Sequence, residues 1–349
     1  MKKNLIGRTN LSISELGIGT APIGGWPKFL EEKKALETLE SAWESGIRYF
    51  DTAPFYGYGM AEERLGKFLK NKVRNEYVVS TKVGRIIIDS DKNSTFEPFF
   101  QGSPKREPYF DFSYDATLKS FEDSLKRLQL DKIDILLIHD PDNHFEEAIN
   151  GSLKAIQRLK DEKVISAVGC GMNQNEMLTK FANTGLIDCF LLAGRFTLLD
   201  QRSLDKLLPT CEKNHISLII GGVFNSGILI DPSSTSYFDY VKLNDSWLEN
   251  AKRLGVRLPE SYESNDYWLN KANKINVICN KHKVNLKTAA LKFPYLNKNI
   301  ATVLTGVSSK EEVLENLNSY LSEINEDLWN ELEEKNLIQK ISVNNLIII

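Results

Sequence analysis

Residues 133–139 read IDILLIH, and the apolar side chains from Ile135 to Ile138 follow one another without a polar break. A short strand that is apolar on both faces is typical of a parallel sheet covered by helices. Similar runs occur at 15–20, 48–52, 77–83, 166–170, 188–193, 216–223 and 301–307. Amphipathic helical patterns alternate with them, at 31–45, 62–71, 115–128, 146–161, 174–184, 200–214, 266–282 and 309–321. Eight such β-then-α units close a barrel, so we predict one α/β domain over residues 1–349, a (β/α)8 TIM barrel.

The glycines after the first predicted strand favour this barrel over an open sheet. A doubly wound, dinucleotide-binding sheet usually carries G-x-G-x-x-G at that point. Residues 17–25 read GIGTAPIGG, with a different glycine spacing, so the open sheet is the second choice. Long segments follow strand three (84–112) and strand seven (230–262). Loops at the C-terminal ends of barrel strands surround the active site, so we predict lids there, with plain surface insertions as the alternative.

Composition narrows the class of protein further. The chain has 349 residues, 42% hydrophobic and 26% charged, with a net charge of -3. Without a long basic run, no nucleic-acid partner is predicted. No segment approaches the ~18 consecutive apolar residues of a membrane span, so we expect no membrane and a cytoplasmic location. The cysteines Cys170, Cys189, Cys211 and Cys279 are widely spaced, which predicts reduced thiols. The oligomeric state stays open.

Polar residues lie at or just after the C-terminal ends of three consecutive predicted strands. Asp51 ends the second strand, with Tyr56 in the following loop, while Lys82 ends the third and His139 the fourth. Each alone also has a structural interpretation, such as a solvated lysine or a turn-capping aspartate. Together they can meet in one pocket, where an ammonium beside a phenol lowers the phenol's pKa from its ordinary value of about 10. Asp51 would orient Lys82, and neutral His139 would donate a hydrogen bond to a carbonyl oxygen, which predicts proton transfer at Tyr56 as hydride reaches or leaves carbon.

A metal site is the competing interpretation of the loop after the fourth strand. Residues 139–144 read HDPDNH and contain two histidines and two aspartates, which are metal-ligating types. No further His or Cys cluster in the sequence completes a coordination shell. We therefore predict no metal and expect this loop to shape the substrate pocket.

The chain resembles the aldo-keto reductases. Residues 50–57 (FDTAPFYG), 80–84 (STKVG) and 136–141 (LLIHDP) are similar to the motifs of that family's catalytic tetrad, in the same order and strand positions. The resemblance implies tetrad roles for Asp51, Tyr56, Lys82 and His139. It extends from an N-terminal β-hairpin in 5–14 (LIGRTNLSIS) to a cofactor segment in 305–316 (TGVSSKEEVLEN).

The resemblance also implies a nicotinamide cofactor across the barrel mouth, with its pyrophosphate under the loop at 221–229. The implied cofactor contacts are Gly19, Thr20, Asp51, Asn173, Gly222, Val223, Phe224, Asn225, Gly227, Gly306, Ser308, Glu312, Glu315 and Asn316. Gly222 follows strand seven where many members have a stacking tyrosine, so which residue stacks on the nicotinamide stays open. Residues 308–312 read SSKEE and lack the arginines that many members use for a 2′-phosphate. A carboxylate there repels phosphate and can bond a ribose hydroxyl, so we predict NAD in preference to NADP.

The branch of the family that the motifs resemble contains the D-threo-aldose (L-fucose type) 1-dehydrogenases and the pyridoxal 4-dehydrogenases. This resemblance implies a small sugar or aldehyde as substrate, with an aldose such as L-fucose or L-galactose oxidised at C1 to its lactone. The expected substrate contacts are Trp26, Tyr56, Arg85, His139, Asp140 and Arg195. A pyridoxal 4-dehydrogenase and a general aldehyde or ketone reductase are the alternative enzymes. A nicotinamide-binding redox sensor, resembling the potassium-channel β-subunits, is the alternative of another class.

Overall fold

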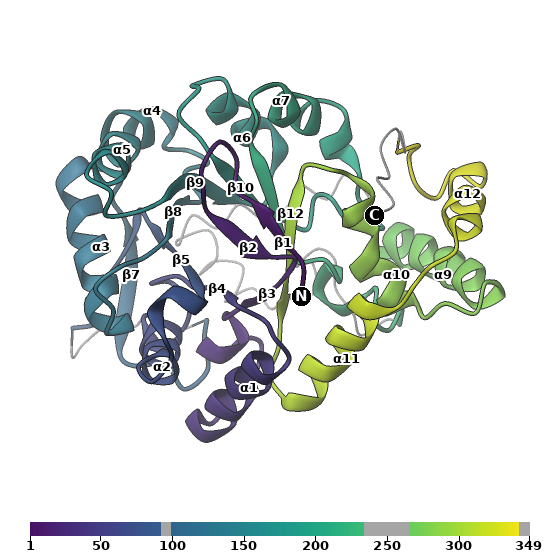
Figure 1. The fold of residues 1–349 in the computed structure, drawn as a ribbon, viewed down its shortest axis with the longest axis horizontal. Coiled ribbons are helices and arrows are strands. Elements are labelled where there is room, and N and C mark those ends of the chain that lie inside the picture. Colours follow the sequence, from purple (N-terminus) through teal and green to yellow (C-terminus); the bar gives the residue numbers. More distant parts are fainter. Residues whose placement is uncertain (92–98, 234–264, 342–349) are drawn as a thin grey trace.

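The computed structural model describes residues 1–91, 99–233 and 265–341, which form a closed parallel barrel surrounded by helices (Figure 1). Around the barrel, the strands are β3 (Leu16–Gly19), β4 (Tyr49–Asp51), β5 (Val78–Val83), β8 (Ile135–His139), β9 (Ala167–Met172), β10 (Cys189–Ala193), β11 (Ser217–Gly221) and β12 (Ile300–Gly306). Parallel pairing of β12 with β3 closes the ring. The predicted α/β barrel is confirmed, and the open doubly wound sheet was the wrong alternative.

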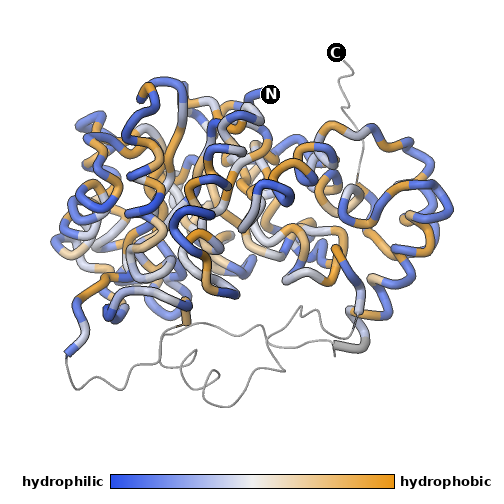
Figure 2. The backbone as a smooth tube through the Cα atoms, turned by 90° about the horizontal axis from the view of Figure 1, so that it is seen from below, coloured by the Kyte–Doolittle hydropathy of each residue, from blue (hydrophilic) through white to orange (hydrophobic). Residues whose placement is uncertain are grey.

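Helices pack around the outside of the barrel with apolar residues turned inward. They are α1 (Glu32–Glu44), α2 (Met60–Leu69), α3 (Tyr114–Leu128), α4 (Phe145–Glu147), α5 (Lys154–Asp161), α6 (Asn175–Ala182), α7 (Leu207–Lys213), α9 (Asn265–Lys281), α10 (Leu286–Lys292), α11 (Lys310–Leu321) and α12 (Glu326–Glu334). Hydrophilic and hydrophobic residues alternate along them, as amphipathic helices require (Figure 2). In the described part of the chain no helix has the length and apolar character to span a membrane.

Most predicted helices match, with two local differences. The pattern at 146–161 forms a helix whose middle, Ala148–Leu153, is a π-helix. The pattern at 200–214 forms only α7 after a 3-10 turn at Arg202–Leu204. Helices α10 and α12 lie outside the predicted helical ranges and follow the expected helices.

A β-hairpin closes the N-terminal end of the barrel. Its strands β1 (Lys3–Leu5) and β2 (Ser12–Ser14) pair antiparallel and lie across the barrel in Figure 1. Ile13 of β2 and Ile6 directly after β1 are buried and belong to the apolar cluster that also contains Tyr49 and Leu137. The opposite, C-terminal end of the barrel is therefore the open one.

The four cysteines are buried and not in disulfide bonds, as their spacing predicts.

The long segment after β5 is more ordered than a loop. It contains a second hairpin, β6 (Arg85–Asp89) paired antiparallel with β7 (Arg106–Phe110). Arg106 holds it to the barrel by donating to Glu63 at 2.8 Å and to the Tyr58 carbonyl at 3.1 Å. Residues 92–98, and most of the second predicted lid at 230–262, lie outside the described residues, so the lid function remains a prediction.

Candidate active site

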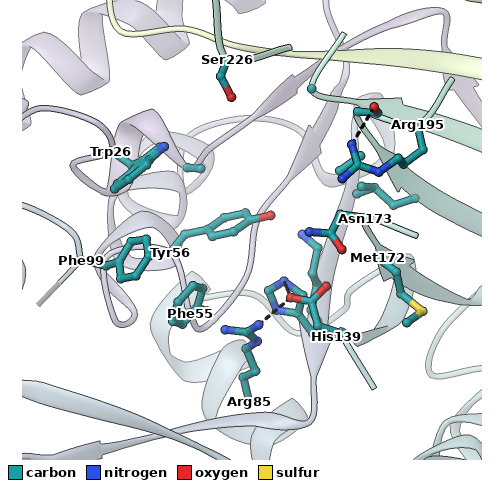
Figure 3. Close-up of a pocket in the computed structure, with 18 of the residues that line it drawn as sticks. Trp26, Phe55, Tyr56, Arg85, Phe99, His139, Met172, Asn173, Arg195 and Ser226 are labelled. Atoms are coloured by element: carbon teal, nitrogen blue, oxygen red, sulfur yellow. Dashed lines mark hydrogen bonds and ion pairs between the residues drawn. The ribbon is translucent and has the colours of Figure 1, made fainter. Parts of the chain in front are cut away.

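A pocket of about 280 Å³ opens at the C-terminal ends of the barrel strands (Figure 3). Many of the predicted site residues line it: Trp26, Tyr56, Lys82, Arg85, His139, Asp140, Asn173, Arg195, Gly222 and Asn225. The remaining predicted residues do not line the pocket: Gly19, Thr20, Asp51, Val223, Phe224, Gly227, Gly306, Ser308, Glu312, Glu315 and Asn316. The strand-end residues Tyr56, Lys82 and His139 therefore converge on one pocket as expected.

Lys82 is fixed at the floor of this pocket by acceptors from β4 and the residue after it. Its Nζ donates to Asp51 Oδ2 at 2.7 Å and to the Thr52 carbonyl at 2.9 Å. Asp51 is itself held by Ser80, whose Oγ donates to Oδ1 at 2.7 Å. Burial lowers the pKa of Lys82, but Asp51 and Tyr56 more than offset this and leave it raised. Lys82 is therefore held as a buried cation, and Ser80 is a hydrogen-bond partner of Asp51 that was not predicted from the sequence.

Tyr56 lies beside that cation. Lys82 Nζ is 4.5 Å from the centroid of the Tyr56 ring, and in Figure 3 the hydroxyl points away from Trp26 and Phe99 into the pocket. Burial raises the pKa of Tyr56, and the charge of Lys82 offsets this only in part. The predicted net lowering of this pKa was wrong, because the desolvation of a buried phenol outweighs the nearby ammonium. Tyr56 is therefore a protonated phenol at neutral pH.

His139 completes the group from β8. Its ring stands at 89° to that of Tyr56, with centroids 6.0 Å apart. Burial, and then the charges of Arg85 and Lys82, hold the pKa of His139 well below its ordinary range. A neutral imidazole carries one N–H, so His139 can donate a hydrogen bond to a substrate oxygen without carrying charge.

An ion pair forms the wall next to His139. Arg85 Nη2 donates to Asp140 Oδ2 at 2.6 Å, and this oxygen lies 3.6 Å from His139 Nε2. The Arg85 guanidinium lies against the rings of Phe55 and Phe110, with Cζ 4.3 and 4.8 Å from their centroids. Both polar residues were predicted from the resemblance, and the structure brings them together at the pocket.

Aromatic side chains form the adjoining wall. Trp26 and Phe99 lie with ring centroids 5.2 Å apart, and Phe55 meets Phe100 edge-on at 5.3 Å. Phe99 and Phe100 come from the long segment after β5 and were not predicted as site residues. The only signal was their position as adjacent aromatics in a segment interpreted as a lid.

Several predicted cofactor residues present unused polar atoms. Thr20 Oγ1 after β3, Asn225 Oδ1 after β11 and Asn316 Oδ1 in α11 are buried and lack a hydrogen-bond partner in the described part of the chain. Buried polar groups are normally hydrogen-bonded, so atoms of this kind suit a polar ligand that passes from the barrel mouth toward α11. Gly222 and Gly227 have φ of 62° and 99°, which lets the backbone turn close to such a ligand without a side chain. The residues present fit an elongated nucleotide cofactor.

At the start of α11 the carboxylates have protein partners. Ser308 donates to Glu312 Oε2 through its backbone N at 2.7 Å and through its hydroxyl at 3.1 Å. Glu315 accepts from Lys287 Nζ at 2.7 Å. Glu312 therefore sits as a fixed negative charge at the N-terminal turn of α11, where the adenosine end of the cofactor is expected.

The possible metal ligands after β8 turn to different partners. Asp140 pairs with Arg85, Asp142 accepts from Gln174 Nε2 at 2.6 Å, and His144 Nδ1 lies 2.8 Å from Glu147 Oε2. Among residues 1–91, 99–233 and 265–341, no three His, Cys, Asp or Glu side chains are grouped as a metal site. His139 and Asp140 line the pocket, whereas Asp142 and His144 do not.

A parallel barrel with tyrosine, lysine, aspartate and histidine grouped at its mouth defines a class, the barrel oxidoreductases that use a nicotinamide cofactor. The chain belongs to the aldo/keto reductase family, whose family model matches residues 15–337. It is 34% identical to a pyridoxal 4-dehydrogenase from Microbacterium luteolum, over 97% of this chain and 98% of the relative. It is also 34% identical to a D-threo-aldose 1-dehydrogenase from a Pseudomonas species, over 94% of this chain and 95% of the relative. The solved structure of a glycerol dehydrogenase from Gluconobacter oxydans shares the fold, with a TM-score of 0.73 at 21% identity, over 99% of this chain and 98% of that one.

Proposed function

We propose that this oxidoreductase interconverts an alcohol and a carbonyl at Tyr56, and that its substrate is an aldose oxidised at C1 to the lactone. The observation that carries the proposal is the placement of Tyr56 between a fixed cation and a neutral hydrogen-bond donor. Lys82 lies 4.5 Å from the Tyr56 ring, and His139 meets that ring edge-on at 6.0 Å. The aldose is supported by the D-threo-aldose 1-dehydrogenase relative.

The four side chains have complementary tasks in this proposal. Tyr56 donates a proton to the carbonyl oxygen during reduction and accepts the hydroxyl proton during oxidation. His139 donates a hydrogen bond to the same oxygen and orients it. Lys82, held by Asp51, stabilises the phenolate form of Tyr56. Tyr56 becomes a phenolate after reduction, and it must be a phenolate before oxidation. A nicotinamide bound at the barrel mouth supplies or accepts the hydride.

The raised pKa of Tyr56 favours reduction at neutral pH, because the phenol already holds the proton that this direction requires. Oxidation of an aldose requires the phenolate, so its rate rises with pH in this proposal. The two directions of one reaction therefore have opposite pH dependences that report on a single group.

The cofactor is held by the residues with unused polar atoms and by the loop after β11. Asn173 lines the pocket and would bond the carboxamide of the nicotinamide, while Gly222 and Gly227 admit the pyrophosphate. We propose NAD because the Glu312 carboxylate, bound to Ser308, repels a 2′-phosphate. Steady-state kinetics with both cofactors test this, and a preference of about tenfold for NADP would contradict it.

A pyridoxal 4-dehydrogenase is the second candidate, and one observation favours it. The wall formed by Trp26, Phe55, Phe99 and Phe100 suits a planar aromatic ring. The same wall can pack against the apolar face of a sugar, while Arg85, Asp140 and Arg195 meet its hydroxyls. The polar side of the pocket supports the aldose, and the aromatic side supports pyridoxal.

A substrate panel distinguishes these proposals. L-fucose, L-galactose, D-arabinose and pyridoxal are each incubated with NAD, and NADH formation is followed by absorbance. We expect turnover of L-fucose or L-galactose. Turnover of pyridoxal alone would favour the second candidate. If no aldose is turned over, the aldose proposal is wrong. A protein that binds NAD but oxidises and reduces nothing would instead be the redox sensor.

A further inference from the structure

Asp140 has an unusual backbone conformation at the pocket wall. Its φ is 46°, in the left-handed region that residues other than glycine seldom adopt, although aspartate and asparagine tolerate it better than most. Its backbone N is held there by the Gly171 carbonyl at 3.0 Å. Backbone conformations of this kind concentrate at functional sites, because the surrounding structure must maintain them. Here the turn directs the carboxylate into the pocket.

Only one of the two carboxylate oxygens of Asp140 is used by the protein. Oδ2 accepts from Arg85, whereas Oδ1 accepts no hydrogen bond from any residue within 1–91, 99–233 and 265–341. The side chain is 24% exposed, so Oδ1 is accessible from the pocket. A fixed carboxylate oxygen of this kind is a strong acceptor for a ligand hydroxyl.

Arg85 favours the ionised form of that acceptor. Burial raises the pKa of Asp140, and the Arg85 guanidinium offsets this shift only in part, so the pKa stays above its ordinary value. The guanidinium cannot easily turn away, since it is buried with its Cζ against the rings of Phe55 and Phe110. Asp140 is thus held in one orientation, and the Arg85 guanidinium compensates its negative charge.

The position of Asp140 relative to His139 determines what it can recognise. His139 Nε2 lies 3.6 Å from Asp140 Oδ2, and both side chains line the same pocket. A substrate whose reacting oxygen meets Tyr56 and His139 therefore presents its next carbon toward Asp140.

We propose that Asp140 is a specificity-determining residue, whose free Oδ1 accepts a hydrogen bond from a hydroxyl on the carbon adjacent to the reacting carbon. The pocket then selects 2-hydroxy aldehydes and the cyclic hemiacetals that carry the same hydroxyl. This inference rests on the proposed alcohol–carbonyl chemistry but does not require that an aldose be the natural substrate. A carbonyl compound without that hydroxyl leaves the Asp140 acceptor desolvated and unpaired, and this cost discriminates against it.

A matched pair of aldehydes tests the proposal. Lactaldehyde and propanal differ only by the hydroxyl on the adjacent carbon, and both are reduced with NADH by the full-length protein. We expect kcat/KM for lactaldehyde to exceed that for propanal by about tenfold to a hundredfold, the range for a hydrogen bond to a charged group. The measured quantity is this ratio, because it cancels general losses of activity.

Two variants remove the free oxygen in different ways. Asp140→Asn keeps the shape of the side chain and tolerates the positive φ. When the amide carbonyl of the new side chain faces Arg85, its NH2 group takes the place of Oδ1, so a donor replaces the acceptor. Asp140→Gly removes the side chain at a φ that glycine adopts readily. Both should reduce the lactaldehyde to propanal ratio about tenfold or more, chiefly through the loss of lactaldehyde turnover. Asp123→Asn, which removes the ion pairs with Lys119 and Lys126 on α3 outside the pocket, is the matched control and should leave the ratio unchanged.

Two results would overturn the inference. They are an equal kcat/KM for both aldehydes in the unmodified protein, and an unchanged ratio in both Asp140 variants, which an equal loss with both aldehydes would produce. Reduction of neither aldehyde by the unmodified protein is a different failure, since it removes the proposed chemistry at Tyr56 and the inference along with it.

Discussion

Aspartates lie at both ends of the barrel strands, and they bind different partners at each end. At the N-terminal end, Asp134 before β8 accepts from the Val79 backbone N at 2.8 Å and from Arg74 at 2.7 Å. Asp188 before β10 repeats the arrangement, accepting from the Val168 backbone N at 2.9 Å and from Lys160 at 2.6 Å. Each joins two neighbouring strands and pairs with a cation that reaches the surface.

At the C-terminal end, the aspartates hold cations that line the pocket. Asp51 fixes buried Lys82, and Asp140 fixes buried Arg85. Unpartnered polar atoms of the described residues also gather here, including His139 Nδ1, Thr20 Oγ1 and Asn225 Oδ1. The contrast teaches that the aspartates at the N-terminal end bond to the barrel's own backbone, while those at the C-terminal end hold cations beside polar atoms that a ligand can use. Variants at the two ends should therefore separate stability from activity.

The largest effect is expected at Tyr56. Tyr56→Phe removes the group that exchanges the proton, so kcat should fall by about 10²- to 10⁴-fold in both directions, the usual worth of general acid–base catalysis. The binding of NAD, measured by fluorescence titration, should change little because the ring remains. Tyr109→Phe, at an exposed tyrosine of β7, is the control and should be fully active. Substantial activity in Tyr56→Phe would refute the assigned role.

A second effect should distinguish the two directions of the reaction. Lys82→Met removes the charge that favours the Tyr56 phenolate, so the pKa of Tyr56 rises further. Oxidation at neutral pH needs the phenolate, so its kcat should fall by about a hundredfold. Reduction uses the protonated phenol, so its kcat should fall less.

Since this substitution leaves Asp51 buried without its cation, the double variant Lys82→Met with Asp51→Asn serves as the folding control. The pH profiles of both directions are the measurement. An equal loss in both directions at every pH would show that Lys82 acts only on structure.

The sequence predicts the barrel and the grouping of Asp51, Tyr56, Lys82 and His139, because both depend on local position. Each residue lies at or just beyond the end of an apolar run, and the ends of neighbouring parallel strands meet. The direction of the Tyr56 pKa was not predictable in this way, since it depends on how deeply the folded chain buries the phenol.

The hairpin of β6 and β7 was missed for a different reason. Its first strand, RIIID, lacks the alternation that marks a half-buried strand, and its second, REPYF, contains a proline. The pocket positions of Phe99 and Phe100 depend on this hairpin and on packing against Trp26 and Phe55. Contacts between distant segments of this kind leave no local pattern.

A smaller effect, on stability alone, is expected at the N-terminal end. Asp134→Asn weakens the hydrogen bonds from Val79 and Arg74, so the free energy of unfolding should fall by about 2 kcal/mol. Its kcat and KM should stay at the values of the unmodified protein, because Asp134 lies at the far end of β8 from His139. Urea denaturation and steady-state kinetics on the same preparations check both statements. A kinetic defect in the folded variant would contradict the division of labour between the two ends.

The smallest effect is a pH dependence of stability at the C-terminal end. Burial, Arg85 and Lys82 hold the pKa of His139 below its unfolded value of about 6.5. The unfolded chain therefore binds a proton that the folded chain excludes. The contribution of His139 to the free energy of unfolding is complete above pH ~6.5 and is lost as the pH falls toward the folded pKa. The slope contributed by one group is at most about 1.4 kcal/mol per pH unit. His139→Asn should remove that slope from urea denaturation curves between about pH 6.5 and 5, whereas His144→Asn, at a half-buried histidine five residues along, should retain it. An identical slope in His139→Asn and the unmodified protein would mean that His139 is not held neutral, and the hydrogen bond assigned to it would need another donor.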